Sequence, residues 1–167
     1  MGLEEPVLLV DKQDRPVGTA TRREVRAGNL LHRCAVILVR RPGGEILVHR
    51  RAADKDVYPG YHDLFVGGIV APGETYLEAA RRELAEETGI DAAPTWLGRF
   101  LHEDAVERSF LGCFEIVWAG PIALQEAEIA WGAFLPPAEV GSLLRTESFC
   151  PDTLAVFDAV RGGLAAT

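Results

Sequence analysis

Short apolar runs rich in β-branched residues recur along the first part of the chain, and polar turns separate them. The opening PVLLVDKQDRPVGTA predicts two short strands around a turn at residues 11–15. Two further runs, 34–40 and 45–50, flank Pro42-Gly43-Gly44 and predict a β-hairpin. The first part of the chain is therefore predicted to contribute strands.

The remaining pattern adds both strands and helices. A polar loop over 51–63 leads to a short apolar strand, 64–66, which runs into two glycines. Later runs predict strands at 95–103, 109–120 and 128–136, a short helix from Pro136-Pro137 to Leu144, and a last helix that begins after Ser148 and ends at Gly162-Gly163. Strands with interspersed helices indicate an α/β or α+β layered domain with a mixed sheet.

A further helix is predicted between Thr75 and Gly89, in the segment TYLEAARRELAEETG. Thr75 and Glu78 have the spacing of a capping box, and Gly89 is the expected C-terminal stop. At about 100° per residue, three apolar side chains share a stripe that should face the core. They are Leu77, Ala80 and Leu84.

The same helix carries three glutamates, Glu83, Glu86 and Glu87, at positions i, i+3 and i+4. One interpretation is a solvated face on which Arg81 and Arg82 pair with them. The other interpretation is a site for a hard divalent cation, because Mg²⁺ takes oxygen ligands and keeps waters and phosphates as its remaining ligands. Mutual repulsion of the carboxylates and a preceding glycine-rich turn, which lets a ligand approach the backbone closely, favour the cation site.

Composition and charge narrow the function classes. The chain has 167 residues, enough for one domain with a proper core, and a formal net charge of −8. Such a field repels nucleic acids and anionic membranes, so a phosphate-bearing substrate needs a local basic patch or a bound cation. No run has the length of a membrane span, and the N-terminus lacks the basic region of a signal peptide, so the cytoplasm is the expected compartment.

From Gly68 to Ile90 the sequence fits every fixed position of the Nudix box: Gly68, five residues, Glu74, seven residues, then RELAEETGI. The chain therefore resembles the Nudix hydrolase family. The resemblance implies an α/β class protein with the Nudix fold, an α/β/α sandwich with a mixed β-sheet and a loop-helix-loop catalytic motif, in a single domain over 1–167. It also implies a divalent-metal-dependent pyrophosphohydrolase, in which water attacks a phosphorus of a nucleoside diphosphate derivative.

The resemblance also assigns roles within the box. Glu86 and Glu87 are implied as the principal ligands of Mg²⁺, with Mn²⁺ as an alternative. Glu83 is implied as a third ligand or as the base that acts on water. Gly67 or Gly68 is expected to give the metal a backbone carbonyl. The metal would neutralise phosphate oxygens and lower the pKa of the attacking water.

Residues around these ligands receive supporting roles. Arg82 is expected to orient a box carboxylate through a bidentate pair, and Glu74 to tie the loop to the helix. Many Nudix enzymes recruit one more carboxylate from outside the box, and Glu107 is our choice for it. The other acids considered for this role are Glu103, Asp104 and Glu115. A surface acid with no such role is the alternative for Glu107.

Upstream, HRCAVILVRRPGGEILVHRRAADKDVYPGYHDLFVGG resembles the matching stretch of isopentenyl-diphosphate isomerase and its hydrolase-like relatives. That resemblance implies that Arg51 and Lys55 hold a substrate diphosphate, whereas a solvated basic loop is the alternative. The isomerase needs a cysteine and a metal-binding histidine where this chain has Val66 and Gly68. We therefore expect a hydrolase, with His32 packed or hydrogen-bonded in its strand rather than bound to a metal.

Three functions stay open at this point. The first is hydrolysis of a small nucleotide, the second is isomerisation of a prenyl diphosphate, and the third is a non-catalytic nucleotide-binding Nudix domain. The complete set of box glutamates favours the first. A small-molecule nucleotide is the expected partner, with neither nucleic acid nor membrane involved, and a homodimer is possible in this family.

Overall fold

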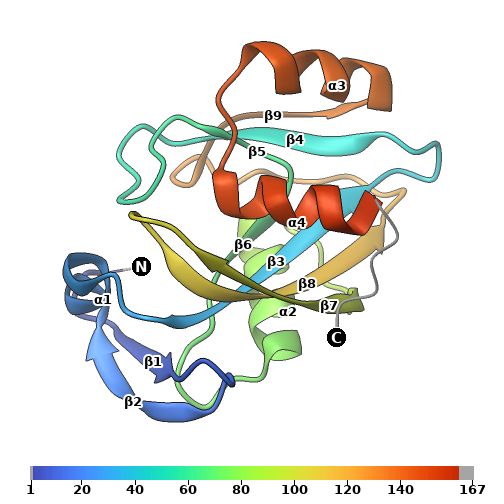
Figure 1. Ribbon diagram of the computed structural model, residues 1–167. Helices are drawn as coiled ribbons and strands as arrows, with labels where there is room; N and C mark the ends of the chain where they lie inside the picture. The colour runs from blue at the N-terminus through green and yellow to red at the C-terminus, as the bar shows by residue number, and fades with distance from the viewer. Residues whose placement is uncertain (1, 162–167) are drawn as a thin grey trace.

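The computed structural model describes residues 2–161, which form a mixed sheet with helices on both faces (Figure 1). The strands are β1 (Pro6–Val10), β2 (Pro16–Thr21), β3 (His32–Arg40), β4 (Ile46–Arg51), β5 (His62–Asp63), β6 (Val66–Ile69), β7 (Thr95–Glu103), β8 (Arg108–Val117) and β9 (Ile129–Leu135). The helices are α1 (Arg22–Gly28), α2 (Tyr76–Thr88), α3 (Pro137–Thr146) and α4 (Pro151–Arg161). The predicted end of the last helix, Gly162-Gly163, lies outside the described residues.

Strand β3 is the centre of the sheet, between helices α2 and α4 (Figure 1). It runs parallel to β8 along its whole length and antiparallel to β6. Its side chains alternate between two cores: Cys34, Val36 and Leu38 pack with α4, whereas Ala35, Ile37 and Val39 pack with α2. Burial on both faces explains the unbroken apolar run in this strand. The α/β/α sandwich that the sequence predicted is confirmed.

The predicted turn at Pro42-Gly43-Gly44 forms and joins β3 to β4 as antiparallel strands, but the two strands pair only beside the turn. Within the described chain, β3 and β4 pair in register only at Arg40 and Ile46. Strand β3 has β8 and β6 as its main neighbours, while β4 pairs mainly with β9 and β5. A strand has only two edges, so segments from later in the chain take the positions that a hairpin partner would use. The strand pair predicted around 11–15 and the strands predicted later in the chain do form, with slightly shifted ends.

The short strand predicted at 64–66 is also misplaced, because β6 contains the glycine pair instead of ending before it. Gly67 and Gly68 lie opposite Val36 and Ala35 of β3. A Cβ atom at Gly67, where φ is +151°, would overlap the carbonyl oxygen of Ala35. These glycines therefore permit close strand pairing, and the tight turn comes later, at residues 71–74.

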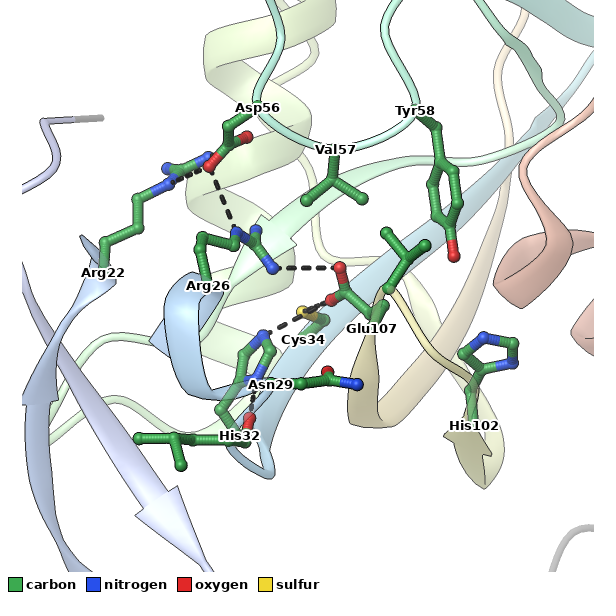
Figure 2. A network of polar contacts seen from close by, with 12 residues as sticks. Arg22, Arg26, Asn29, His32, Cys34, Asp56, Val57, Tyr58, His102 and Glu107 are labelled. Atoms are coloured by element: carbon green, nitrogen blue, oxygen red, sulfur yellow. Dashed lines mark hydrogen bonds and ion pairs between the residues drawn. The ribbon is translucent and has the colours of Figure 1, made fainter. Parts of the chain in front are cut away.

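Helix α1 was not predicted, although its start signal is present in the sequence. Thr21 and Glu24 form a complete capping box, and Asn29 ends the helix in the left-handed conformation with φ +45°. The helix carries Arg22 and Arg26 toward the interior of the molecule (Figure 2). Among residues 2–161, no helix combines the length and the apolar character that a membrane crossing requires.

Candidate active site

Helix α2 has both predicted caps and lies against β3 and β6. Ala80 and Leu84 are fully buried, as predicted, but Leu77 is 44% exposed. Ala79 occupies the core in its place, because the helix turns its two small alanines toward the sheet. The prediction for Leu77 was therefore wrong, and the buried face of the helix extends to the glutamates instead.

The three box glutamates converge on one pocket of about 280 Å³, but they differ in exposure. Glu83 and Glu87 are buried, with 6% and 8% of their surface exposed, whereas the Glu86 side chain is 58% exposed. Gly67 and Gly68 line the same pocket. The predicted ligand residues are thus brought together, with two carboxylates below the surface and one at the rim.

The absence of a side chain at Gly68 makes room for Glu83. A Cβ atom built there would lie 2.5 Å from Glu83 Oε1 and 2.7 Å from its carboxyl carbon. The carboxylate therefore rests directly against the strand backbone. The Glu83 carboxylate offers oxygen donors at this wall of the pocket, and oxygen donors suit a hard cation.

Arg82 connects the elements that frame the box. Its Nε donates to Glu74 Oε1 at 2.8 Å and its Nη2 donates to Glu74 Oε2 at 2.9 Å, while Nη1 reaches Glu83 Oε1 at 2.5 Å. Nη2 also donates to the carbonyl oxygen of Ile69, and Glu74 accepts from the amide of Ala71 at 2.8 Å. This geometry agrees with the expected bidentate pair and with a loop tied to the helix.

Burial perturbs two carboxylates of the box. It raises the pKa of Glu87 well above the usual range, and the negative charge of Glu83 raises it further. Burial also raises the pKa of Glu83, although the guanidinium of Arg82 opposes this effect. Carboxylates held together out of water favour either a proton or a cation.

A fourth carboxylate, Glu128, lines the pocket beside the box and was not among the residues considered from the sequence. It precedes β9, in the loop over residues 118–128. It lines the same pocket as Glu83 and Glu87, and its negative charge raises the pKa of both. The amide of Gln125 donates to the carbonyl oxygen of Glu87 at 3.0 Å, which attaches this loop to the end of α2. It was missed because the segment was assigned to a strand, and only the tertiary fold brings it to the helix.

The two residues predicted to bind phosphate, Arg51 and Lys55, both line this pocket. Arg51 donates from Nε and Nη2 to the carbonyl oxygen of Val57, at 3.2 and 3.0 Å. Lys55 forms an ion pair with Glu128. The local positive charge that an acidic protein needs for a phosphate substrate is therefore present, and part of it is already paired with a carboxylate.

Glu107 also lines the pocket, in a separate network of polar contacts (Figure 2). Arg26 Nη1 donates to its Oε2 at 2.9 Å, and His32 Nε2 lies 3.4 Å from its Oε1, an electrostatic contact outside hydrogen-bond geometry. The thiol of Cys34 is 3.9 Å from the same oxygen. Burial alone would raise the pKa of Glu107, but His32 and Arg26 hold it below the usual value.

His32 is packed in its strand, as expected. It is 1% exposed, and its Nδ1 lies 2.8 Å from the carbonyl oxygen of Leu30. The donor atoms of His32, Cys34 and Glu107 lie within 4.8 Å of one another, a spacing that could hold a metal. Arg26 already supplies a positive charge to this buried carboxylate, so we describe the group as an ion-pair network.

Helix α1 fixes the loop that covers this network. Asp56 accepts hydrogen bonds from Arg22 Nε at 2.9 Å and from Arg26 Nε at 3.1 Å (Figure 2). Tyr58, farther along the same loop, donates to Asp104 at 2.9 Å. These side-chain contacts join residues 52–61 to helix α1 and to the loop between β7 and β8.

The opposite wall comes from the start of helix α4. Asp63 accepts hydrogen bonds from the Thr153 hydroxyl at 2.7 Å and from the amide of Phe65 at 3.0 Å. Asp152 has a buried oxygen, Oδ1, without a hydrogen-bond partner among the described residues. Burial, helped by the charge of Asp63, raises the pKa of Asp152 to about 7. Asp152 could not be predicted as a pocket residue from the sequence, because α4 reaches the pocket only in the folded chain.

The model of the NUDIX domain family matches residues 30–155, most of the chain. The chain therefore belongs to the Nudix family. It is 40% identical to Uncharacterized Nudix hydrolase SCO1686 of Streptomyces coelicolor, over 95% of this chain and 89% of that protein. It is 41% identical to Uncharacterized Nudix hydrolase PA4841 of Pseudomonas aeruginosa, over 90% of this chain and 89% of that protein. These relatives identify it as a hydrolase acting on pyrophosphate-type bonds.

Solved structures agree with this family. DR0079 from Deinococcus radiodurans superposes with a TM-score of 0.75 at 25% identity, covering 89% of this chain and 94% of that one. The NUDIX domain of NrtR from Shewanella oneidensis, solved as a complex with ADP ribose, has a TM-score of 0.61 at 20% identity. It covers 80% of this chain and 87% of that one, and it shows the common fold. Nudix enzymes generally use divalent metals.

Proposed function

We propose that this protein is a Mg²⁺-dependent pyrophosphohydrolase of small nucleoside diphosphate derivatives, formed by a single domain. The observation that carries the proposal is the convergence of Glu83, Glu86 and Glu87 on one pocket that also contains Arg51 and Lys55. The donors around the box are all oxygens, which suits Mg²⁺ or Mn²⁺ better than a thiophilic metal. The residues present therefore fit the metal that the family implies.

In this proposal Glu86 and Glu87 hold the metal, together with Glu83 and a backbone carbonyl of Gly67 or Gly68. When bound, the metal neutralises phosphate oxygens and supplies a water of lowered pKa. Arg82 fixes the Glu83 carboxylate through Nη1 and anchors itself on Glu74, so this ligand does not need to reorganise.

The remaining pocket residues position the substrate. Lys55 and Arg51 face the diphosphate, and their positive charges offset the repulsion that a net charge of −8 exerts on a polyanion. Glu107 is proposed as a further pocket carboxylate for catalysis, and Arg26 and His32 flank its two oxygens. Nucleic acid and membrane have no part in the proposal, and the site as described lies within one chain, whether or not a homodimer forms.

The choice of a nucleotide rests on the fold neighbours. The NrtR NUDIX domain is described with ADP ribose, a molecule with a pyrophosphate link between two sugar-bearing groups. Prenyl-diphosphate isomerisation is the alternative, and it is less well supported. Val66, at the position of the cysteine that this reaction needs, is an aliphatic side chain with 1% exposure.

A substrate panel tests the proposal. Nucleoside di- and triphosphates, nucleotide sugars, ADP ribose, other dinucleotides and isopentenyl diphosphate are incubated with Mg²⁺ or Mn²⁺, and phosphate release and products are measured. We expect cleavage of one group of nucleotides by the wild type and by Glu126→Gln, an exposed charge-matched control. Glu86→Gln should lose almost all of this activity. Isomerisation without hydrolysis would overturn the proposal, and nucleotide binding without turnover would favour a non-catalytic domain.

A further inference from the structure

Asp104 lies in the loop between β7 and β8, shortly before Glu107. Among the residues that the structure describes, the pocket wall includes Glu107 but not Asp104. The Oδ1 of Asp104 accepts hydrogen bonds from the amides of Val106 and Glu107, at 2.7 and 2.8 Å. Its own amide donates to the carbonyl oxygen of Glu107 at 2.9 Å. Asp104 therefore fixes the backbone from which the Glu107 side chain enters the pocket.

The second oxygen of the Asp104 carboxylate, Oδ2, is bound to a different part of the chain. It accepts a hydrogen bond from the Tyr58 hydroxyl at 2.9 Å, and His102 Nε2 lies 3.0 Å from it. The Tyr58 hydroxyl and the His102 ring point toward the same part of the molecule (Figure 2). Burial would raise the pKa of Asp104, but the hydrogen bonds from the two amides, His102 and Tyr58 lower it to about 2. The group is therefore ionised, and its two oxygens connect Glu107 to Tyr58.

Tyr58 has an unfavourable backbone conformation. Its φ is +48°, in the left-handed region that a bulky side chain rarely adopts. Such a conformation persists only where the surrounding contacts hold it. The contacts here are the hydrogen bond to Asp104 and the ring of Tyr61, whose centroid lies 5.6 Å from that of Tyr58. Tyr58 also lines the pocket, so a substrate in the pocket meets the residue that holds Asp104.

Helix α1 holds the loop between β7 and β8 at two points. Asn29, which ends the helix, donates from Nδ2 to the carbonyl oxygen of Asp104 at 2.8 Å. Arg26, on the same helix, donates to the carboxylate of Glu107 (Figure 2). The loop is thus anchored to α1 at both acids, and the Asp104 carboxylate is the contact that joins it to Tyr58.

We propose that Asp104 is a positioning residue that couples residues 52–61 to Glu107. The Tyr58 hydroxyl orients the Asp104 carboxylate, and this carboxylate holds the amides that orient Glu107. A substrate group that contacts Tyr58 therefore affects the placement of Glu107, which belongs to a different loop. The inference rests on the proposed function for the role of Glu107 in catalysis. Misplacement of a catalytic group by about 1 Å can lower the reaction rate about 100-fold.

Hydrogen exchange in the absence of substrate tests the coupling. Exchange of the Val106 and Glu107 amides is followed by NMR in the full chain. Asp104→Ala should speed the exchange of both amides by about tenfold or more. Tyr58→Phe, which removes only a hydroxyl group, should speed it by roughly three- to tenfold. Tyr61→Phe is the matched control in the same loop, and it should leave both exchange rates as in the wild type.

Turnover of the best nucleotide in the panel, at saturating Mg²⁺, tests the effect on catalysis. Asp104→Ala should lower kcat by about 10- to 100-fold with little change in KM. Asp104→Asn keeps an oxygen acceptor for the two amides and should retain most of the activity. Glu103→Ala, at the neighbouring position on β7, should be as active as the wild type. In the Glu107→Gln background, Asp104→Ala should change kcat by less than about twofold, because Asp104 acts through Glu107.

Two results would overturn the inference. Unchanged exchange of the Val106 and Glu107 amides in Tyr58→Phe would show that the two loops are not coupled. A loss of kcat from Asp104→Ala that is as large in the Glu107→Gln background as in the wild type would show that Asp104 supports the fold rather than Glu107. If the wild type cleaves no nucleotide, the proposed function fails, whereas the exchange rates still decide the coupling. Circular dichroism and thermal melting show which variants are folded, and Tyr58→Phe decides the coupling if Asp104→Ala does not fold.

Discussion

Arg82 donates two parallel hydrogen bonds to Glu74, from Nε to Oε1 at 2.8 Å and from Nη2 to Oε2 at 2.9 Å. The third nitrogen of the same guanidinium holds Glu83. One planar group thereby sets the distance between the loop that precedes α2 and a carboxylate inside the pocket. A lysine ammonium cannot reproduce this geometry, because it is a point charge on a flexible stem.

Arg82→Lys should therefore lower kcat by about 10- to 100-fold, as expected for loss of a group that orients metal ligands. The reaction is measured with the best nucleotide of the panel at saturating Mg²⁺. Arg81→Lys is the matched control, since Arg81 lies on the same helix with a side chain that is 55% exposed. Equal activity in the two variants would show that the bidentate pair has no role in positioning.

Gly68→Ala should displace the Glu83 carboxylate while leaving the fold largely intact. The new methyl group would meet the end of a side chain, which can move. Gly67→Ala should instead unfold the protein at lower temperature, because its methyl group would meet the backbone of β3. Thermal melting and Mn²⁺ titration distinguish the two cases. Normal Mn²⁺ binding by Gly68→Ala would contradict a role for Glu83 in the metal site.

The raised pKa of Asp152, about 7, predicts how stability changes with pH. The folded state retains a proton that the unfolded state releases near pH 4, so the contribution of Asp152 to stability falls as pH rises from about 4 to 7. Asp152→Asn should remove this loss and raise the melting temperature by several degrees at pH 8, relative to wild type, but little at pH 4.

Asp158→Asn, an exposed position on the same helix, is the control for that measurement. It should leave the difference in melting temperature between pH 4 and pH 8 unchanged. If Asp152→Asn melts like the wild type at both pH values, burial near Asp63 does not raise the pKa of the Asp152 carboxyl group.

Removal of divalent metal should abolish turnover without unfolding the chain. At a Mg²⁺ concentration of about 100 times Kd, binding stabilises the folded state by about 2.7 kcal/mol, which corresponds to a rise of several degrees in Tm. Addition of EDTA should abolish the activity and cancel this rise in Tm. Glu86→Gln should show a much smaller rise with Mg²⁺, and an undiminished rise in this variant would place the metal elsewhere.

The box could be predicted from the sequence because its information is local. The caps at Thr75 and Gly89, the spacing of the glutamates and the glycines before them all lie within one short stretch. The pairing of strands could not be predicted in the same way. Strand β3 has a run of apolar residues that would suit several partners, and the neighbours it takes are set by competition among distant segments.

The remaining pocket residues illustrate the same limit. Glu107 was selected from several acids and does line the pocket, because the hairpin of β7 and β8 brings it there. Glu128 and Asp152 reach the pocket only through tertiary contacts. Leu77 was misassigned because helical periodicity defines which residues share a face, but not how the face is rotated against a sheet.

The attachment of loop 118–128 to the end of α2 also affects which insertions the chain can accept. Backbone bonds fix that loop to the box helix, so a change in its length would move Glu128. Residues 52–61 close on themselves through Arg51 and Tyr61, and only side chains hold the tip of this loop to the pocket wall. Insertions at that tip would alter the space available to a substrate without disturbing the metal site. Insertions after Lys55, at residues 56–60, should therefore change substrate preference, whereas loop 118–128 has to keep its length.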